Sequence, residues 1–140
     1  MKGSPVIVAL MLLLLLVVGC GENKPLPPED YMIEFQIPMS SMTVDPPAFP
    51  SDPVVVKLSG IIGPDSRYQF DHAEIEETPS SFEISLIGVR NADPNTGFLD
   101  VLVEWVDQEF QKQPPHSNRV HVVFHQPNGE ILEETVVVVE

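Results

Sequence analysis

Hydrophobic and polar residues alternate over most of the chain that follows residue 30. A period of two is typical of β-strands that bury one face. The pattern predicts strands at residues 31–37, 54–59, 68–77, 82–90, 120–125 and 131–139. In the strand at 82–90, Phe82, Ile84 and Leu86 are expected to point inward. In the strand at 68–77, the apolar positions change phase after His72, which predicts a β-bulge near residues 71–73.

Proline and glycine residues mark the connections between these strands. Pro38 ends the first strand, and the proline-rich residues 39–53 are expected to form a long irregular connection. Gly60 is expected to end the second strand. Asn128-Gly129 lies between two alternating runs, which is the strongest short-range signal for a β-hairpin.

Residues 98–112 fit two patterns. Five apolar residues fall at helical spacing, namely Leu99, Leu102, Val103, Val106 and Phe110. With a period of two, one strand face is formed instead by Leu99, Val101, Val103 and Trp105. The valines, the tryptophan and the surrounding predicted strands favour a strand, and a helix remains the alternative.

The N-terminus has the order of an export signal. Lys2 precedes an uninterrupted apolar run of 14 residues at positions 5–18. A permanent membrane helix needs roughly 20 apolar residues, so this run is short for one. A cleaved signal is therefore favoured, either an ordinary secretory one or one that leads to lipidation, and an uncleaved single-helix anchor is the alternative.

The run ends in Val17-Val18-Gly19-Cys20, which resembles the lipobox of bacterial lipoproteins. The resemblance implies a signal peptide at residues 1–19 and a diacylglycerol on the Cys20 thiol, so that Cys20 becomes the N-terminus. Residues 20–30 would then be a lipidated N-terminus and a proline-rich tether, ~30 Å long when extended. Gly21 after the cysteine implies the outer membrane of the cell envelope, if the host has two membranes.

The charge of the chain restricts its possible partners, and its cysteine content restricts how the domain can be stabilised. The chain carries 7 basic and 21 acidic residues, and removal of Lys2 with the signal would leave a net charge of −15 (6 minus 21). Such a surface repels phosphate backbones, which excludes nucleic acid as a partner. Cys20 is the only cysteine, so packing alone must stabilise the domain, without a disulfide.

Seven predicted strands with turn signals between them indicate an all-β fold, a single β-sandwich over residues 31–140. In the spacing of its predicted strands along the chain, this domain resembles the small immunoglobulin-like domains of bacterial surface lipoproteins. The Cys…Trp…Cys pattern of true immunoglobulin domains is absent.

One loop has the residue types of a calcium site. Asp93, Asn95 and Asp100 supply oxygens, and Gly97 would allow the chain to fold back between them. An acid at the fifth position and a later bidentate Glu are missing. The alternative is an Asp-Pro-Asn turn between strands. Calcium is the one cofactor that the sequence suggests.

The remaining polar residues suggest no catalytic site. His121 and His125 would lie roughly 13 Å apart along a strand, too far to share a metal ion. Glu74, Glu76 and Glu83 are interpreted as a solvated face. We therefore expect a lipid-anchored envelope protein that is not an enzyme and that binds an envelope protein or polymer, or supports adhesion or assembly. The alternative is an inhibitor or accessory subunit of an envelope enzyme.

Overall fold

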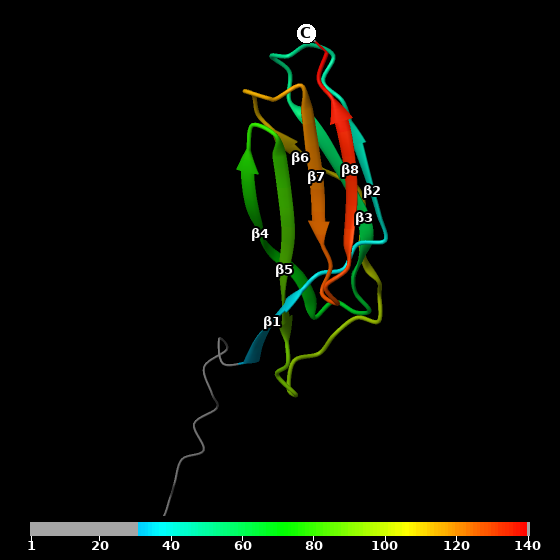
Figure 1. The fold of residues 1–140 in the computed structure, drawn as a ribbon. Coiled ribbons are helices and arrows are strands. Elements are labelled where there is room, and N and C mark those ends of the chain that lie inside the picture. The colour runs from blue at the N-terminus through cyan, green and yellow to red at the C-terminus, as the bar shows by residue number, and fades with distance from the viewer. Residues whose placement is uncertain (1–30, 140) are drawn as a thin grey trace, which may run out of the picture.

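The computed structural model describes residues 31–139, and these residues form eight β-strands and no α-helix (Figure 1). The strands are β1 (Met32–Gln36), β2 (Ser41–Asp45), β3 (Val54–Gly63), β4 (Tyr68–Thr78), β5 (Ser81–Asn91), β6 (Val103–Lys112), β7 (Arg119–His125) and β8 (Ile131–Val137). They are arranged in two sheets, so the predicted all-β sandwich is confirmed.

The larger sheet is built around β5. One side of β5 pairs with β4 in an antiparallel register, from Tyr68↔Arg90 to Thr78↔Ser81. The other side is shared, because β1 pairs antiparallel with one half of β5 and β7 pairs parallel with the other half. β8 continues the sheet beyond β7. The parallel pair arises because β6, which lies between β5 and β7 in the chain, belongs to the second sheet.

The second sheet has the order β2-β3-β6, and all its pairs are antiparallel. Alternate residues of β3 and β5 point between the two sheets, as the sequence pattern predicts. The buried core consists of Ile37, Met39, Val44, Val54, Val56, Leu58, Ile62, Phe82, Ile84, Leu86, Val120, Val122, Phe124, Val136 and Val138. The inward positions predicted for Phe82, Ile84 and Leu86 are thus confirmed.

Two predictions about the first half of the domain are wrong. Residues 39–53 are not irregular throughout, because they contain the additional strand β2. This strand buries only Val44 fully, so its alternation is too short to be seen beside so many prolines. β3 also continues past Gly60 to Gly63. A Cβ at Gly60 would lie 2.8 Å from the Met39 Cα, so this glycine allows two backbones to approach and does not end the strand.

The ambiguous residues 98–112 contain a strand from Val103 onward, and the helical alternative is wrong. The predicted strand is also too long, because Leu99 and Val101 lie before it and are exposed. Between Leu58↔Gln108 and Gly60↔Trp105 the register shifts, and β6 carries one more residue than β3. Asp107 in this bulge has a φ of 50°. The extra residue changes the phase of β6, so that Trp105 and Phe110 both pack against the core. Of the five apolar residues at helical spacing, Leu99 and Leu102 lie before this strand, and Val106 is exposed, so the spacing does not mark a buried face.

Two local predictions are confirmed. β4 has a bulge between Phe70↔Gly88 and His72↔Ile87, where the sequence changes phase. β7 and β8 form the predicted hairpin, and Gly129 adopts a φ of 81° in its turn. A positive φ is what glycine provides at low cost in hairpin turns.

Asp65 is a buried carboxylate, and it leads to a prediction about acid stability. It lies in the β3–β4 connection and accepts hydrogen bonds from the Arg67 side chain at 2.7 and 2.9 Å and from the Arg67 backbone at 3.0 Å. The Arg67 side chain is the main reason that the pKa of Asp65 lies below its ordinary value. Because the folded pKa is lowered, this contribution is present above the unfolded pKa of ~3.9 and is lost as the pH falls through the folded pKa.

We expect Asp65→Asn to lower the free energy of unfolding at neutral pH, and its difference from the wild type to shrink as the pH falls below about 4. Denaturant unfolding across that pH range measures both effects. Asp45→Asn is the control, because the 2.6 Å ion pair of Asp45 with Lys57 is solvent-exposed and should contribute little. A constant difference at all pH values would contradict the role of ionised Asp65.

Candidate acidic binding face

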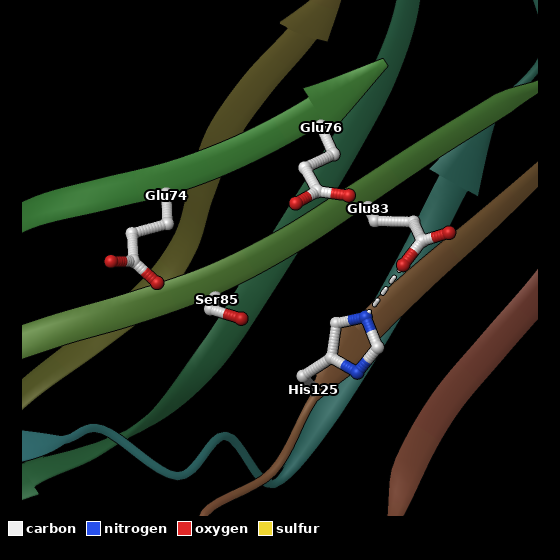
Figure 2. Close-up of a pocket in the computed structure, with 5 residues that line it drawn as sticks. All are labelled: Glu74, Glu76, Glu83, Ser85 and His125. Carbon is white, nitrogen blue, oxygen red and sulfur yellow. Dashed lines mark hydrogen bonds and ion pairs between the residues drawn. The ribbon is translucent and has the colours of Figure 1, made fainter. Parts of the chain in front are cut away.

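The outer face of the larger sheet contains a hollow of about 330 Å³ (Figure 2). It is lined by Glu74, Glu76, Glu83, Ser85 and His125. We call these five residues the acidic face. The consecutive strands β4 and β5 contribute to it, together with the end of β7, which lies farther along the chain.

The alternation of β5 places two of these residues on the surface. Because Phe82, Ile84 and Leu86 point into the core, Glu83 and Ser85 point outward. The antiparallel register then sets Glu76 opposite Glu83, and Glu74 opposite Ser85. The sequence pattern predicts a solvated face formed by the three glutamates, and the structure brings them together there, on neighbouring strands.

The sequence alone did not predict that His125 lies beside these glutamates. The parallel pairing of β5 with β7 carries it to Glu83, 42 residues away, where its Nε2 lies 2.8 Å from a Glu83 oxygen. Figure 2 shows this contact beside Glu76. No spacing along the chain signals it, because it depends on which two strands become neighbours.

The electrostatics of the acidic face are unbalanced. Its lining holds three carboxylates, and neither lysine nor arginine is among the lining residues. Like charges directly opposite on neighbouring strands destabilise a sheet, and Glu76 and Glu83 are such a pair. A cationic group placed in the hollow would offset this repulsion and could donate hydrogen bonds to several carboxylates at once.

Ser85 and His125 share the hollow, but the hydrogen bond of the imidazole goes to Glu83. Within residues 31–139, no hydrogen bond links the Ser85 hydroxyl to His125 as a nucleophile would require of its base. The three carboxylates of the hollow offer electrostatic and hydrogen-bonding recognition of a cation.

The other three histidines do not line the hollow. His121 contacts Glu133 on β8 at 2.9 Å, so the two histidines of β7 hold different carboxylates. His72 contacts Asp71 at 2.7 Å, and this hydrogen bond is the main cause that raises the pKa of His72. The Nε2 of His116 lies 2.9 Å from the Asp52 carbonyl oxygen.

The predicted calcium loop forms a turn in this structure. One Asp93 carboxylate oxygen accepts from the Asn95 backbone N–H at 2.9 Å, and the other accepts from the Thr96 hydroxyl at 3.1 Å. Both oxygens are therefore already used within the turn, as the alternative interpretation expects. Among residues 31–139, no three His, Cys, Asp or Glu side chains are arranged to hold a metal ion. Calcium binding by Asp93, Asn95 and Asp100 stays a prediction.

The predicted signal peptide, the lipidation site Cys20 and the tether at residues 20–30 lie outside the described residues. Residues 31–139 contain no helix of the length and apolarity needed to cross a membrane.

No protein-family model, no curated protein and no solved structure matches this chain.

Proposed function

We propose that this chain is a lipid-anchored protein of the bacterial cell envelope with a non-enzymatic binding role. In this proposal, the acidic face binds a cationic group of an envelope protein or polymer. The observation that carries it is the grouping of Glu74, Glu76 and Glu83 around one hollow whose lining contains no lysine or arginine. The strong acidic excess of the whole chain supports the same class of partner, because it attracts cations over a longer range.

Binding should depend on these carboxylates in particular. We expect Glu76→Gln combined with Glu83→Gln to weaken the binding of a lysine-rich peptide by about tenfold or more, at ~1 kcal/mol for each exposed ionic contact. Isothermal calorimetry at low ionic strength measures the dissociation constant. Glu104→Gln combined with Glu109→Gln removes the same charge from β6 and is the matched control. Equal weakening by both double variants would show a diffuse charge effect and would contradict a site at the acidic face.

The lipid anchor is tested separately. We expect Cys20→Ala to block lipidation and processing, because the thiol that would receive the diacylglycerol is lost. The chain should then accumulate as a precursor of higher mass, and mass spectrometry of the wild-type N-terminus should show an acylated Cys20. An unmodified mature N-terminus elsewhere would contradict the anchor. Envelope fractionation tests the outer-membrane location that Gly21 favours, and retention in the inner membrane would contradict it.

One observation favours a second candidate function, that of an inhibitor or accessory subunit of an envelope enzyme. Phe49 is strongly exposed in the proline-rich loop between β2 and β3. Backbone and side-chain hydrogen bonds between Phe49 and Asp52 hold this loop in a turn. A loop inhibitor should lose its effect when Phe49 is replaced by Ala, whereas the acidic-face variants should leave the inhibition intact. Crosslinking in the native envelope would identify the partner in either case.

A further inference from the structure

The connection between β5 and β6 exposes a run of apolar side chains. Phe98, Leu99, Val101 and Leu102 each expose more than half of their surface. We call residues 98–102 the apolar loop. Isolated exposed apolar residues are ordinary, but a contiguous group marks a surface that meets a partner or a membrane.

The apolar loop is held in place by the neighbouring β3–β4 connection. The Leu99 N–H donates to the Ser66 hydroxyl at 2.8 Å, and the Leu99 carbonyl accepts from the Ser66 N–H at 3.0 Å. The Arg67 guanidinium lies 4.0 Å from the centre of the Phe98 ring. The loop therefore presents its side chains in a preformed arrangement. The backbone N–H and C=O groups of Leu99 already have hydrogen-bond partners within the domain.

The apolar loop lies at the end of the sandwich where the described chain starts. The Ala92 N–H donates to the Tyr31 carbonyl at 2.8 Å, and Met32 pairs with Asn91. Figure 1 shows β1 and the β5–β6 connection at the end of the domain opposite the C-terminus. The ten residues at 21–30 separate this end from Cys20, a span of at most about 36 Å. A lipid on Cys20 would thus hold this end of the domain close to the bilayer.

The charges near the apolar loop are mixed, because two arginines lie there beside acidic residues such as Asp93. Arg67 and Arg90 are at this end, and Arg67 neutralises the nearby Asp65. Arginine side chains can bury their stems at a membrane interface while their charged groups reach the headgroups. The acidic face lies farther along β4 and β5, toward the opposite end of these strands. Asp100 is the one acidic residue within the loop itself.

We propose that the apolar loop inserts its side chains into the headgroup region of the bilayer to which Cys20 is attached, and so orients the domain upright on the membrane. This inference rests on the proposed lipid anchor. The anchor then supplies attachment, whereas the loop supplies orientation, and the acidic face is left pointing sideways and accessible to a cationic partner.

The test uses the full lipidated chain in vesicles of phosphatidylethanolamine with a minor share of phosphatidylglycerol. Acylation blocks the thiol of Cys20, so one introduced cysteine can be labelled alone with an environment-sensitive fluorophore. Leu99→Cys places the label in the apolar loop, and Val139→Cys places it at the opposite end. These positions are matched, because the two residues are 69% and 68% exposed. We expect a blue shift, and loss of emission with nitroxide-labelled lipids, for the Leu99 position only.

Each other outcome overturns the inference in a distinguishable way. If the vesicles float with acylated protein but both labels remain aqueous, the anchor is right and the insertion is wrong. If the Leu99 label is shielded but nitroxide lipids do not quench it, a protein surface such as a second copy covers the loop. If the chain does not float with the vesicles, the proposed anchor and the insertion both fail.

Discussion

Truncation of Phe82 to alanine is expected to lower the free energy of unfolding by about 3–5 kcal/mol. Phe82 is 1% exposed and is one of the largest fully buried side chains of the described residues. It lies on β5 between β4 and β7, opposite Glu77 on one side and Val122 on the other. The surrounding strands are held by their hydrogen bonds and cannot close the cavity. Since domains are stable by only ~5–15 kcal/mol, this loss is a large share of the total.

Denaturant unfolding of a soluble fragment beginning near residue 30 measures this change. Phe49→Ala is the matched control, because Phe49 is 66% exposed and its truncation should alter the free energy of unfolding by at most about 0.5 kcal/mol. The melting temperature of the fragment should be the same with and without reductant, since Cys20 is the only cysteine. Similar losses for the two phenylalanine variants would argue against a core centred on β5.

Replacement of Gly63 by alanine is expected to destabilise the domain by about 1–3 kcal/mol through overpacking. A Cβ at this position would overlap the Cβ and Cγ atoms of Tyr68, at less than 3.0 Å from each. A rotamer change cannot relieve the overlap with the Tyr68 Cβ, because that atom moves only with the backbone. The clash would displace Tyr68, whose ring packs edge-on against Phe35 with centroids 5.5 Å apart.

Thermal and denaturant unfolding of the same fragment test this second expectation. Gly97→Ala is the matched control, because a Cβ there would meet no atom within 4 Å. It should leave the stability nearly unchanged or raise it slightly by restricting the unfolded chain. A Gly63→Ala variant as stable as Gly97→Ala would show that β3 and β4 separate more easily at this end than the structure indicates.

Local features of the strands could be predicted because each depends on a short stretch of chain. Side chains alternate across a strand with a period of two, so the inward positions of Phe82, Ile84 and Leu86 follow from β5 alone. The β4 bulge shifts that period at one point and is therefore visible in the sequence. The Asn128-Gly129 turn is visible for the same reason, since its backbone conformation is a local requirement.

Features that combine distant segments could not be predicted in this way. The sequence pattern did not predict β2, because only one of its side chains is fully buried and the alternation is therefore weak. Its place in the sheet comes from pairing with β3. The bulge in β6 interrupts its period of two, because two residues of β6 lie opposite one residue of β3 there, and this depends on the pairing of two distant strands. The exposure of the apolar loop was likewise hidden, since apolar composition alone resembles a core segment.

The same distinction between local and long-range features applies to the residues of the acidic face. The sequence alone determined that Glu83 and Ser85 face outward, because their neighbours on β5 must be buried, and it indicated that Glu74 and Glu76 are solvated. Only the tertiary structure decided that His125 joins them, through the parallel pairing of β5 with β7. Side-chain direction is a property of the local backbone, whereas strand order depends on which edges together bury the most apolar surface, and no single spacing along the chain encodes that choice.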